Sequence, residues 1–199
     1  MPALTAALMP VAMLFLAGVC ASAQKPEISS VFWTFIGPQP TGRDASAVSG
    51  RVTAIAVNPR DPSIVYLGSA GGGVWKTADG GLHWEALTDY ESSLVVGAIA
   101  IDPSNENTIY IGTGETNACD DCYGGAGILK STDGGVVWKQ LSSPFVDALG
   151  RGARIGSIAV SPADRNIVLA AVYFVGASGV PGIYRSVNAG ASWTPVLSR

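Results

Sequence analysis

Three octets with a shared spacing indicate the fold: TADGGLHW at residues 77–84, STDGGVVW at residues 131–138 and SVNAGASW at residues 186–193. Their tryptophans are 54 and 55 residues apart. The composition suits a tight hairpin, because a hydroxyl or Asx oxygen accepts backbone N–H groups, glycine tolerates positive φ, and tryptophan packs the turn against its sheet. The structural positions of the pattern are Thr77, Asp79, Gly81 and Trp84; Ser131, Asp133, Gly135 and Trp138; and Ser186, Asn188, Gly190 and Trp193.

Short apolar runs recur in the same order around each octet. First runs at residues 52–57, 96–101 and 155–160 end at Asn-Pro, Asp-Pro or Ser-Pro, and second runs follow at residues 64–68, 108–112 and 167–171. Third runs at residues 73–77, 127–131 and 182–186 lead into the octets, and a fourth opens at each octet's tryptophan. Such β-branched runs between turns predict four strands per repeat. A four-strand unit that recurs at this period is typical of a β-propeller blade.

We therefore predict an all-β chain of three propeller blades, each of four antiparallel strands, over residues 51–90, 91–143 and 144–199. Residues 1–23 are predicted to be a signal peptide, since the apolar run 11–19 precedes the small-x-small site Ala21-Ser22-Ala23. An uncleaved membrane anchor is the alternative. Residues 24–50 are predicted to be a linker that contains an orphan outer strand near residues 32–36.

Three blades leave sheet edges exposed, because closed propellers typically have four to eight blades. We therefore expect an incomplete ring. The chain is expected to be an N-terminal fragment of a larger propeller, or a subunit that closes its ring by self-association.

The octets resemble the Asp-box, Ser/Thr-x-Asp-x-Gly-x-x-Trp, of the bacterial neuraminidase repeat superfamily. That superfamily includes sialidases, xyloglucan-cleaving hydrolases, sortilin-like receptors and photosystem-assembly propellers. The resemblance implies that the octets are folding elements on the face away from the ligand, so Asp79 and Asp133 are not expected to be catalytic. His83 is expected to be an exposed edge residue. Asn188 stands where the motif has Asp, which predicts a looser third turn.

Variation in length is confined to the other face of the predicted blades. Between the second and third runs, Gly68 to Gly73 is 5 residues, Gly112 to Gly127 is 15, and Ala171 to Gly182 is 11. Insertions on one face of a repeat protein usually mark its binding face. We therefore expect any ligand site on this side.

The longest insertion holds the most chemical groups. Glu115, Asp120 and Asp121 are acidic, and Tyr123 can stack on a sugar ring. Cys119 and Cys122 are predicted to form a small disulfide in an exported protein. No cofactor is expected; calcium held by the three carboxylates is an alternative to their being solvated.

Two arginines occupy equivalent positions in the repeat. Arg51 and Arg154 each begin a first strand on the variable face, where the middle repeat has Val95. Together they could grip a carboxylate or sulfate. The favoured interpretation is that each arginine packs its stem and pairs with a nearby Asp or Glu.

Composition excludes several function classes. Of 199 residues, 48% are apolar and 14% are charged, which excludes disorder, and the net charge of −3 leaves no basic stripe for nucleic acid. A single histidine excludes a multi-histidine metal site.

The favoured function is a secreted or periplasmic binding propeller for a glycan or a protein. The alternative is a glycoside hydrolase of the sialidase or xyloglucanase kind, which needs paired carboxylates about 5–10 Å apart. Glu115 is the weak catalytic candidate. Its partner would come from Asp89, Glu91, Asp147 or other parts of a larger protein.

Overall fold

The computed structural model describes residues 51–116, 123–141, 144–145, 152–173 and 180–198. All of these belong to one compact unit of the chain. The predicted leader, the linker with its orphan strand and the tip of the longest insertion lie outside the described residues. No helix that could span a membrane occurs within the described ranges.

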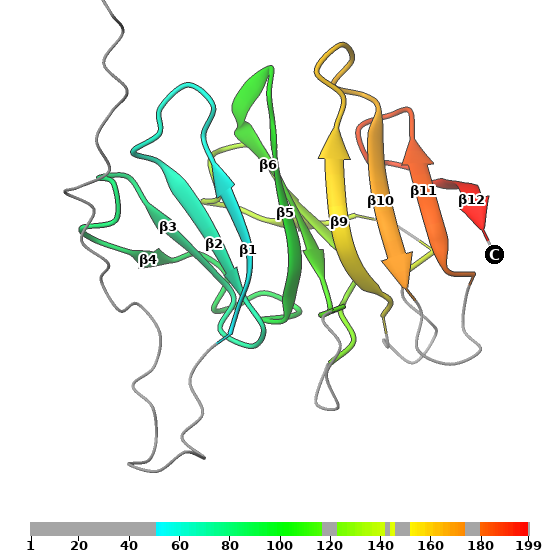
Figure 1. The fold of residues 1–199 in the computed structure, drawn as a ribbon, viewed down its shortest axis with the longest axis horizontal. Helices are drawn as coiled ribbons and strands as arrows, with labels where there is room; N and C mark the ends of the chain where they lie inside the picture. Colours follow the sequence, from blue (N-terminus) through cyan, green and yellow to red (C-terminus); the bar gives the residue numbers. More distant parts are fainter. Residues whose placement is uncertain (1–50, 117–122, 142–143, 146–151, 174–179, 199) are drawn as a thin grey trace, which may run out of the picture. The chain divides into compact units, whose positions relative to one another are not determined.

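The described residues form three separate four-stranded antiparallel sheets and contain no helix, which confirms the predicted all-β fold of an incomplete propeller (Figure 1). We call the sheets blades 1 to 3. Blade 1 contains β1 (Val52–Val57), β2 (Val65–Ser69), β3 (Val74–Thr77) and β4 (Glu85–Ala86). Blade 2 contains β5 (Val96–Asp102), β6 (Asn105–Thr113), β7 (Ile128–Ser131) and β8 (Lys139–Gln140). Blade 3 contains β9 (Arg154–Val160), β10 (Val168–Tyr173), β11 (Gly182–Ser186) and β12 (Thr194–Ser198).

Short polar turns connect the first and second strands of each blade. Asn58 Oδ1 accepts the N–H groups of Arg60 and Asp61, and Asp102 Oδ1 accepts the N–H of Ser104. Such Asx turns satisfy backbone donors locally, and they explain the Asn-Pro and Asp-Pro signals that follow these strands.

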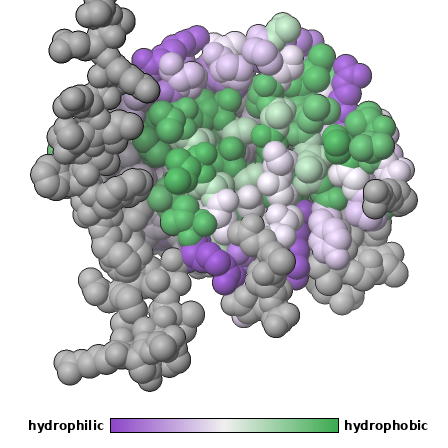
Figure 2. Space-filling view, in the orientation of Figure 1, coloured by the Kyte–Doolittle hydropathy of each residue, from purple (hydrophilic) through white to green (hydrophobic). Residues whose placement is uncertain are grey.

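Glycines allow the blades to approach closely. β1 packs beside β5, and β5 beside β9; the three strands run next to one another, and apolar residues gather over them (Figure 2). A Cβ atom at Gly68 would lie 2.4 Å from Cγ1 of Val96, and one at Gly112 would lie 2.5 Å from Cγ2 of Ile155. The same contact therefore recurs at both junctions between blades.

The core at the junction of blades 2 and 3 includes a residue from the link between them. Phe145 is fully buried, and its ring meets Tyr184 edge to face at 5.0 Å and Trp193 at 5.6 Å between centroids. Aromatic contacts of this kind stabilise beyond the area that they bury. The link thus helps to seal the junction.

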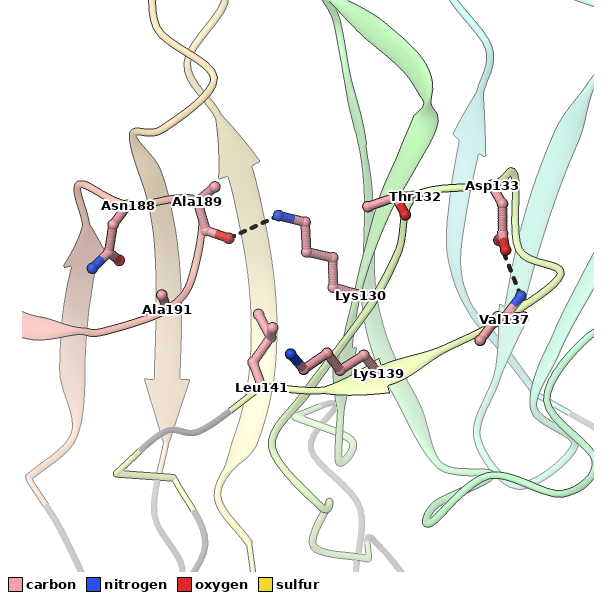
Figure 3. A pocket seen from close by; sticks show the side chains of 9 residues that line it. All are labelled: Lys130, Thr132, Asp133, Val137, Lys139, Leu141, Asn188, Ala189 and Ala191. Carbon is pink, nitrogen blue, oxygen red and sulfur yellow. Dashed lines mark hydrogen bonds between the residues drawn. The ribbon is translucent and has the colours of Figure 1, made fainter.

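A repeated set of hydrogen bonds, which we call the inter-blade lock, joins each blade to the next. The hydroxyl of Tyr66 and the ammonium of Lys76 both donate to the carbonyl of Gly134, each at 3.1 Å. At the next junction Tyr110 and Lys130 donate to the carbonyl of Ala189 at 3.1 and 3.0 Å. Figure 3 shows the bond from Lys130.

The two donors of each lock also pair across neighbouring strands. Each ammonium lies over the tyrosine ring beside it, 5.4 Å from the centroid at Tyr66 and 5.0 Å at Tyr110. Burial raises the pKa of Tyr110 to about 12 and lowers the pKa of Lys130. The tyrosine hydroxyl therefore stays a donor throughout the neutral range.

Candidate functional site

The three octet turns share one hydrogen-bond pattern. In the first, Thr77 Oγ1 accepts the N–H of Gly81 at 2.9 Å and donates to Asp79 Oδ1, which also accepts the N–H of His83. Ser131 and Asp133 repeat this pattern in blade 2. Both carboxylates are thus engaged in closing their own turns, as a folding element requires.

The expectation of a looser third turn is wrong. Asn188 Oδ1 accepts the N–H of Ser192 at 2.8 Å, and Ser186 Oγ accepts the N–H of Gly190 at 2.8 Å. The amide oxygen of asparagine has the same acceptor geometry as a carboxylate oxygen. Its Nδ2 group makes a further bond to Ser192 Oγ at 2.9 Å.

The departure in the third turn lies in its backbone. Ala189 has φ of 54°, whereas the equivalent Gly80 and Gly134 have φ of 72° and 76°.

A left-handed conformation costs an L-residue about 1–2 kcal/mol, a cost that is absent for glycine. Ala189→Gly is therefore expected to raise the free energy of unfolding by up to about 1 kcal/mol, and Gly134→Ala to lower it by about as much. Urea unfolding of both variants checks this pair, and equal effects of the same sign would contradict it.

Acid is expected to weaken the turns that contain aspartate. The N–H of His83 lowers the pKa of Asp79, and the N–H of Val137 lowers the pKa of Asp133. A carboxyl whose folded pKa is depressed stabilises the fold above its unfolded pKa of about 3.9 and loses that contribution as the pH falls below it. The urea midpoint should therefore drop on going from pH 5 to pH 3. Because asparagine serves in the third turn, Asp133→Asn should fold and show a shallower drop; an unchanged slope would count against this role.

His83 lies at the surface, as expected. Its side chain is 90% exposed, and Nδ1 is 2.6 Å from Asp79 Oδ2. The ring therefore takes part in the turn and does not face a cavity.

The loops at the opposite ends of the strands meet on one side, which we call the loop-rich face: residues 69–73, 87–95, 114–116, 123–127 and 152–153. Backbone bonds join them, from Gly73 N to Leu94 O and from Gly125 N to Ala153 O. These are the segments whose lengths vary between blades. Main-chain hydrogen bonds therefore hold the loops of this face together, and the length of the loops differs from blade to blade.

An ion pair on this face joins two of the predicted site residues. Arg51 Nε and Nη2 donate to Glu115 Oε1 and Oε2 at 2.8 and 2.7 Å. Glu115 is 1% exposed and Arg51 44% exposed. The pair connects the start of blade 1 with the base of the longest insertion, and it matches the favoured interpretation of Arg51 as a partner for a nearby acid.

Glu115 is therefore held as a structural acceptor in this conformation. Both carboxylate oxygens receive the guanidinium, and almost none of the side chain reaches the surface. A general acid or nucleophile must reach its substrate. Catalysis by Glu115 would require this pair to open.

Arg154 begins β9 and is partly buried. Its role as an anion ligand stays a prediction. Cys119, Asp120, Asp121 and Cys122 lie outside the described residues, as does Asp147. The disulfide and the calcium alternative thus stay predictions. Within the described ranges, no three His, Cys, Asp or Glu residues approach closely enough to hold a metal ion.

Two tyrosines stand out from the loop-rich face. Tyr123 is 68% exposed, and its carbonyl accepts the N–H of Glu115 at 3.2 Å. Tyr90, in the link between β4 and β5, is fully exposed. Sequence reasoning did not single out Tyr90, although an aromatic residue between Asp89 and Glu91 in a variable link was a usable signal.

A cavity of about 600 Å³ lies on the octet side, between blades 2 and 3. Lys130 crosses it to reach Ala189, while Asp133 turns to its own loop (Figure 3). Its polar groups are thus mostly committed to the turn and the lock. The lining residues are Lys130, Thr132, Asp133, Val137, Lys139, Leu141, Asn188, Ala189 and Ala191.

The chain is similar in sequence to known xyloglucanases, although no family model matches it. It is 32% identical over 160 residues to a xyloglucanase of Paenibacillus sp. and 29% identical over 157 residues to xyloglucanase Xgh74A of Acetivibrio thermocellus. These alignments cover 76% and 75% of the chain. The chain spans only 15% and 18% of the length of those relatives.

Solved structures show the same fold. An ancestral GH74 enzyme is 22% identical with a TM-score of 0.60, over 73% of this chain and 18% of its own. The GH74 enzyme of Niastella koreensis is 25% identical with a TM-score of 0.51, over 71% and 21%. YCF48 from Cyanidioschyzon merolae is 20% identical with a TM-score of 0.50, over 75% and 41%. The fold is therefore a β-propeller of the glycoside-hydrolase-like kind.

Proposed function

We propose that this chain is a propeller segment of an exported protein that binds xyloglucan-type polysaccharide on the loop-rich face. The observation that carries the proposal is the 32% identity to a xyloglucanase over three quarters of the chain. Export follows from the predicted leader and suits a polysaccharide that lies outside the cell. Recognition of a protein on the same face is the alternative.

We also propose that the octets are Asp-boxes of the bacterial neuraminidase repeat type. The shared bonds of Thr77, Ser131 and Ser186 to their turn N–H groups support this assignment. They also support a structural role for the octet side of the molecule, which leaves the loop-rich face for ligands.

Tyr90 and Tyr123 are the residues best placed for sugar stacking. Both rings are largely exposed on the loop-rich face, and Tyr123 is anchored through its carbonyl to Glu115. An aromatic ring presents a flat apolar face to the C–H groups of a pyranose while its hydroxyl stays in water. The neighbouring carboxylates Asp89 and Glu91 supply acceptors for sugar hydroxyl groups.

Isothermal titration with xyloglucan-derived oligosaccharides tests this function. Tyr90→Ala and Tyr123→Ala are each expected to weaken binding about 5- to 10-fold, because an aromatic contact contributes about 1 kcal/mol. Leu82→Ala is the matched control, since Leu82 is 73% exposed on an octet turn. The proposal fails if the chain binds no oligosaccharide, or if only the Leu82 variant loses affinity.

Hydrolysis of xyloglucan is the second candidate function, and the sequence similarity to two xyloglucanases favours it. Because Glu115 is buried in its ion pair, we expect the chain by itself to bind without cleaving. Release of reducing ends from xyloglucan, abolished by Glu115→Gln while binding is retained, would make this segment catalytic instead.

A further inference from the structure

We propose that the cavity on the octet side, between blades 2 and 3, binds a small organic anion whose acidic group lies between the ammonium groups of Lys130 and Lys139. The cavity has a volume of about 600 Å³, and small-molecule sites in proteins span roughly 300–1,000 Å³. This second site is independent of the glycan site proposed for the loop-rich face.

The two lysines stand opposite each other on neighbouring strands. Lys130 of β7 and Lys139 of β8 are paired directly across the antiparallel ladder. Side chains at paired positions lie on the same face of a sheet, where two like charges are destabilising. In blade 1 the same two positions pair Lys76 with Glu85, which places opposite charges together. Blade 2 thus carries an unfavourable charge pair that the hairpin does not require, because blade 1 forms the same hairpin without it.

Both lysine side chains extend from their strands toward the third octet (Figure 3). The ammonium of Lys130 donates to the carbonyl of Ala189 at 3.0 Å, and an ammonium has further N–H donors for a ligand. Within the described ranges, no hydrogen bond or ion pair engages the ammonium of Lys139. Burial lowers the pKa of Lys130, and the nearby cations Arg165 and Lys139 add to this effect. An anion between the two ammonium groups would offset their repulsion.

The third octet departs from the other two at positions that line this cavity. Asn188 stands where they have aspartate, so it closes its turn without adding a negative charge beside the lysines. Ala191 stands where the second octet has Val136, and its shorter side chain leaves more room. At the junction of blades 1 and 2, the positions that correspond to Lys130, Lys139, Asp133 and Asn188 hold one lysine and three carboxylates: Lys76, Glu85, Asp79 and Asp133.

The carboxylate that lines the cavity is engaged elsewhere. Asp133 turns to its own loop, where its Oδ1 accepts the N–H groups of Val136 and Val137 and the hydroxyl of Ser131. The two ammonium groups therefore dominate the charge that a ligand would meet.

The rest of the lining suits an organic body attached to the anionic group. Thr132 supplies a hydroxyl, and Val137, Leu141 and Ala191 supply apolar surface. A lysine ammonium is a point charge that accepts carboxylate and sulfate alike, so the apolar lining has to select the ligand. Contact with this lining favours an acid of monosaccharide size over a mineral anion.

Backbone amide NMR during titration with glucuronate at constant ionic strength tests the proposal. The resonances of residues 130–141 and 188–191 should shift with a dissociation constant on the order of 1 mM, as expected for two charge-assisted hydrogen bonds on a small ligand. Glucose, which is neutral, and chloride at the same ionic strength should leave them unchanged. Inorganic sulfate should bind several-fold more weakly than glucuronate, because it has no apolar body.

Variants of the lining separate this site from general attraction of anions. Lys139→Ala should weaken glucuronate binding about 10-fold or more. Lys139→Glu recreates the charge pair of blade 1, so it should abolish binding and raise the unfolding temperature of the ligand-free chain. Asn188→Asp restores the motif of the other octets and should weaken binding several-fold with the turn intact. Arg185→Ala is the matched control, because it removes the same charge from an exposed position outside the cavity lining, and it should leave binding unchanged.

The absence of shifts with glucuronate overturns the proposal. Equal losses in Lys139→Ala and Arg185→Ala also overturn it, since they would show a non-specific attraction, and so does sulfate that binds as tightly as glucuronate, which would show an adventitious ion only. Thermal unfolding of each variant establishes that it folds. Because xyloglucan oligosaccharides are neutral and are expected on the loop-rich face, failure of either site leaves the other intact.

Discussion

Replacing Gly97 with alanine is expected to destabilise the chain by about 3 kcal/mol, at the upper end of what an added methyl group costs in a close-packed site. A Cβ atom at Gly97 would lie 2.1 Å from the carbonyl oxygen of Gly114 and 2.3 Å from that of Ile155. Both neighbours are backbone atoms, so no side chain can rotate to make room. The strands must separate where β5, the end of β6 and β9 meet.

Gly71→Ala is the matched control for this variant. A Cβ atom at Gly71 would meet nothing within 4 Å, and we expect a change within about 0.5 kcal/mol. Urea unfolding followed by tryptophan fluorescence measures both variants. If Gly97→Ala unfolds at the wild-type midpoint, the close approach of blades 2 and 3 is wrong.

Removing the guanidinium of Arg51 is the second large change, and Arg51→Ala is expected to cost about 3 kcal/mol. The variant leaves the carboxylate of Glu115, which is 1% exposed, without its bidentate partner. Breaking a buried pair from one side costs about 3–5 kcal/mol, and the partial exposure of Arg51 places the expectation at the lower end.

The geometry of the pair supplies two comparisons. Arg51→Lys keeps the charge but cannot donate two parallel bonds, so it should recover only part of the loss. The double variant Arg51→Met with Glu115→Leu removes both charges and should be less destabilised than Arg51→Ala. A double variant that is worse than both single variants would show that the pair is not the stabilising unit.

Much of the fold could be predicted from the sequence because its signals are local and recur. The octets carry their own hydrogen bonds, so Thr77, Asp79 and Gly81 indicate a turn wherever they occur in that order. The apolar runs fixed the strands to within a few residues, and the repeat period fixed their grouping into blades. The error at Asn188 came from treating a residue type as the requirement, when the turn requires only an acceptor oxygen.

The candidate site was less predictable because its contacts join distant parts of the chain. Arg51 and Glu115 are 64 residues apart, and no periodic pattern links an arginine before one blade to a glutamate after the second strand of the next. The residues of the inter-blade lock could have been recognised in the sequence, since Tyr66 and Tyr110 share one repeat position and Lys76 and Lys130 share another. The sequence does not show, however, that these side chains bond to the octet of the following blade, because that depends on the direction in which one blade stacks on the next.

The most direct test of the central claim, a propeller segment with its ligand face on the loop-rich side, is backbone amide NMR during titration with xyloglucan-derived oligosaccharides. The claim predicts shifts in residues 88–94 and 123–127, with the three octets at residues 77–84, 131–138 and 186–193 unchanged. Shifts centred on the octets, or none at any residue at saturating oligosaccharide, would contradict it.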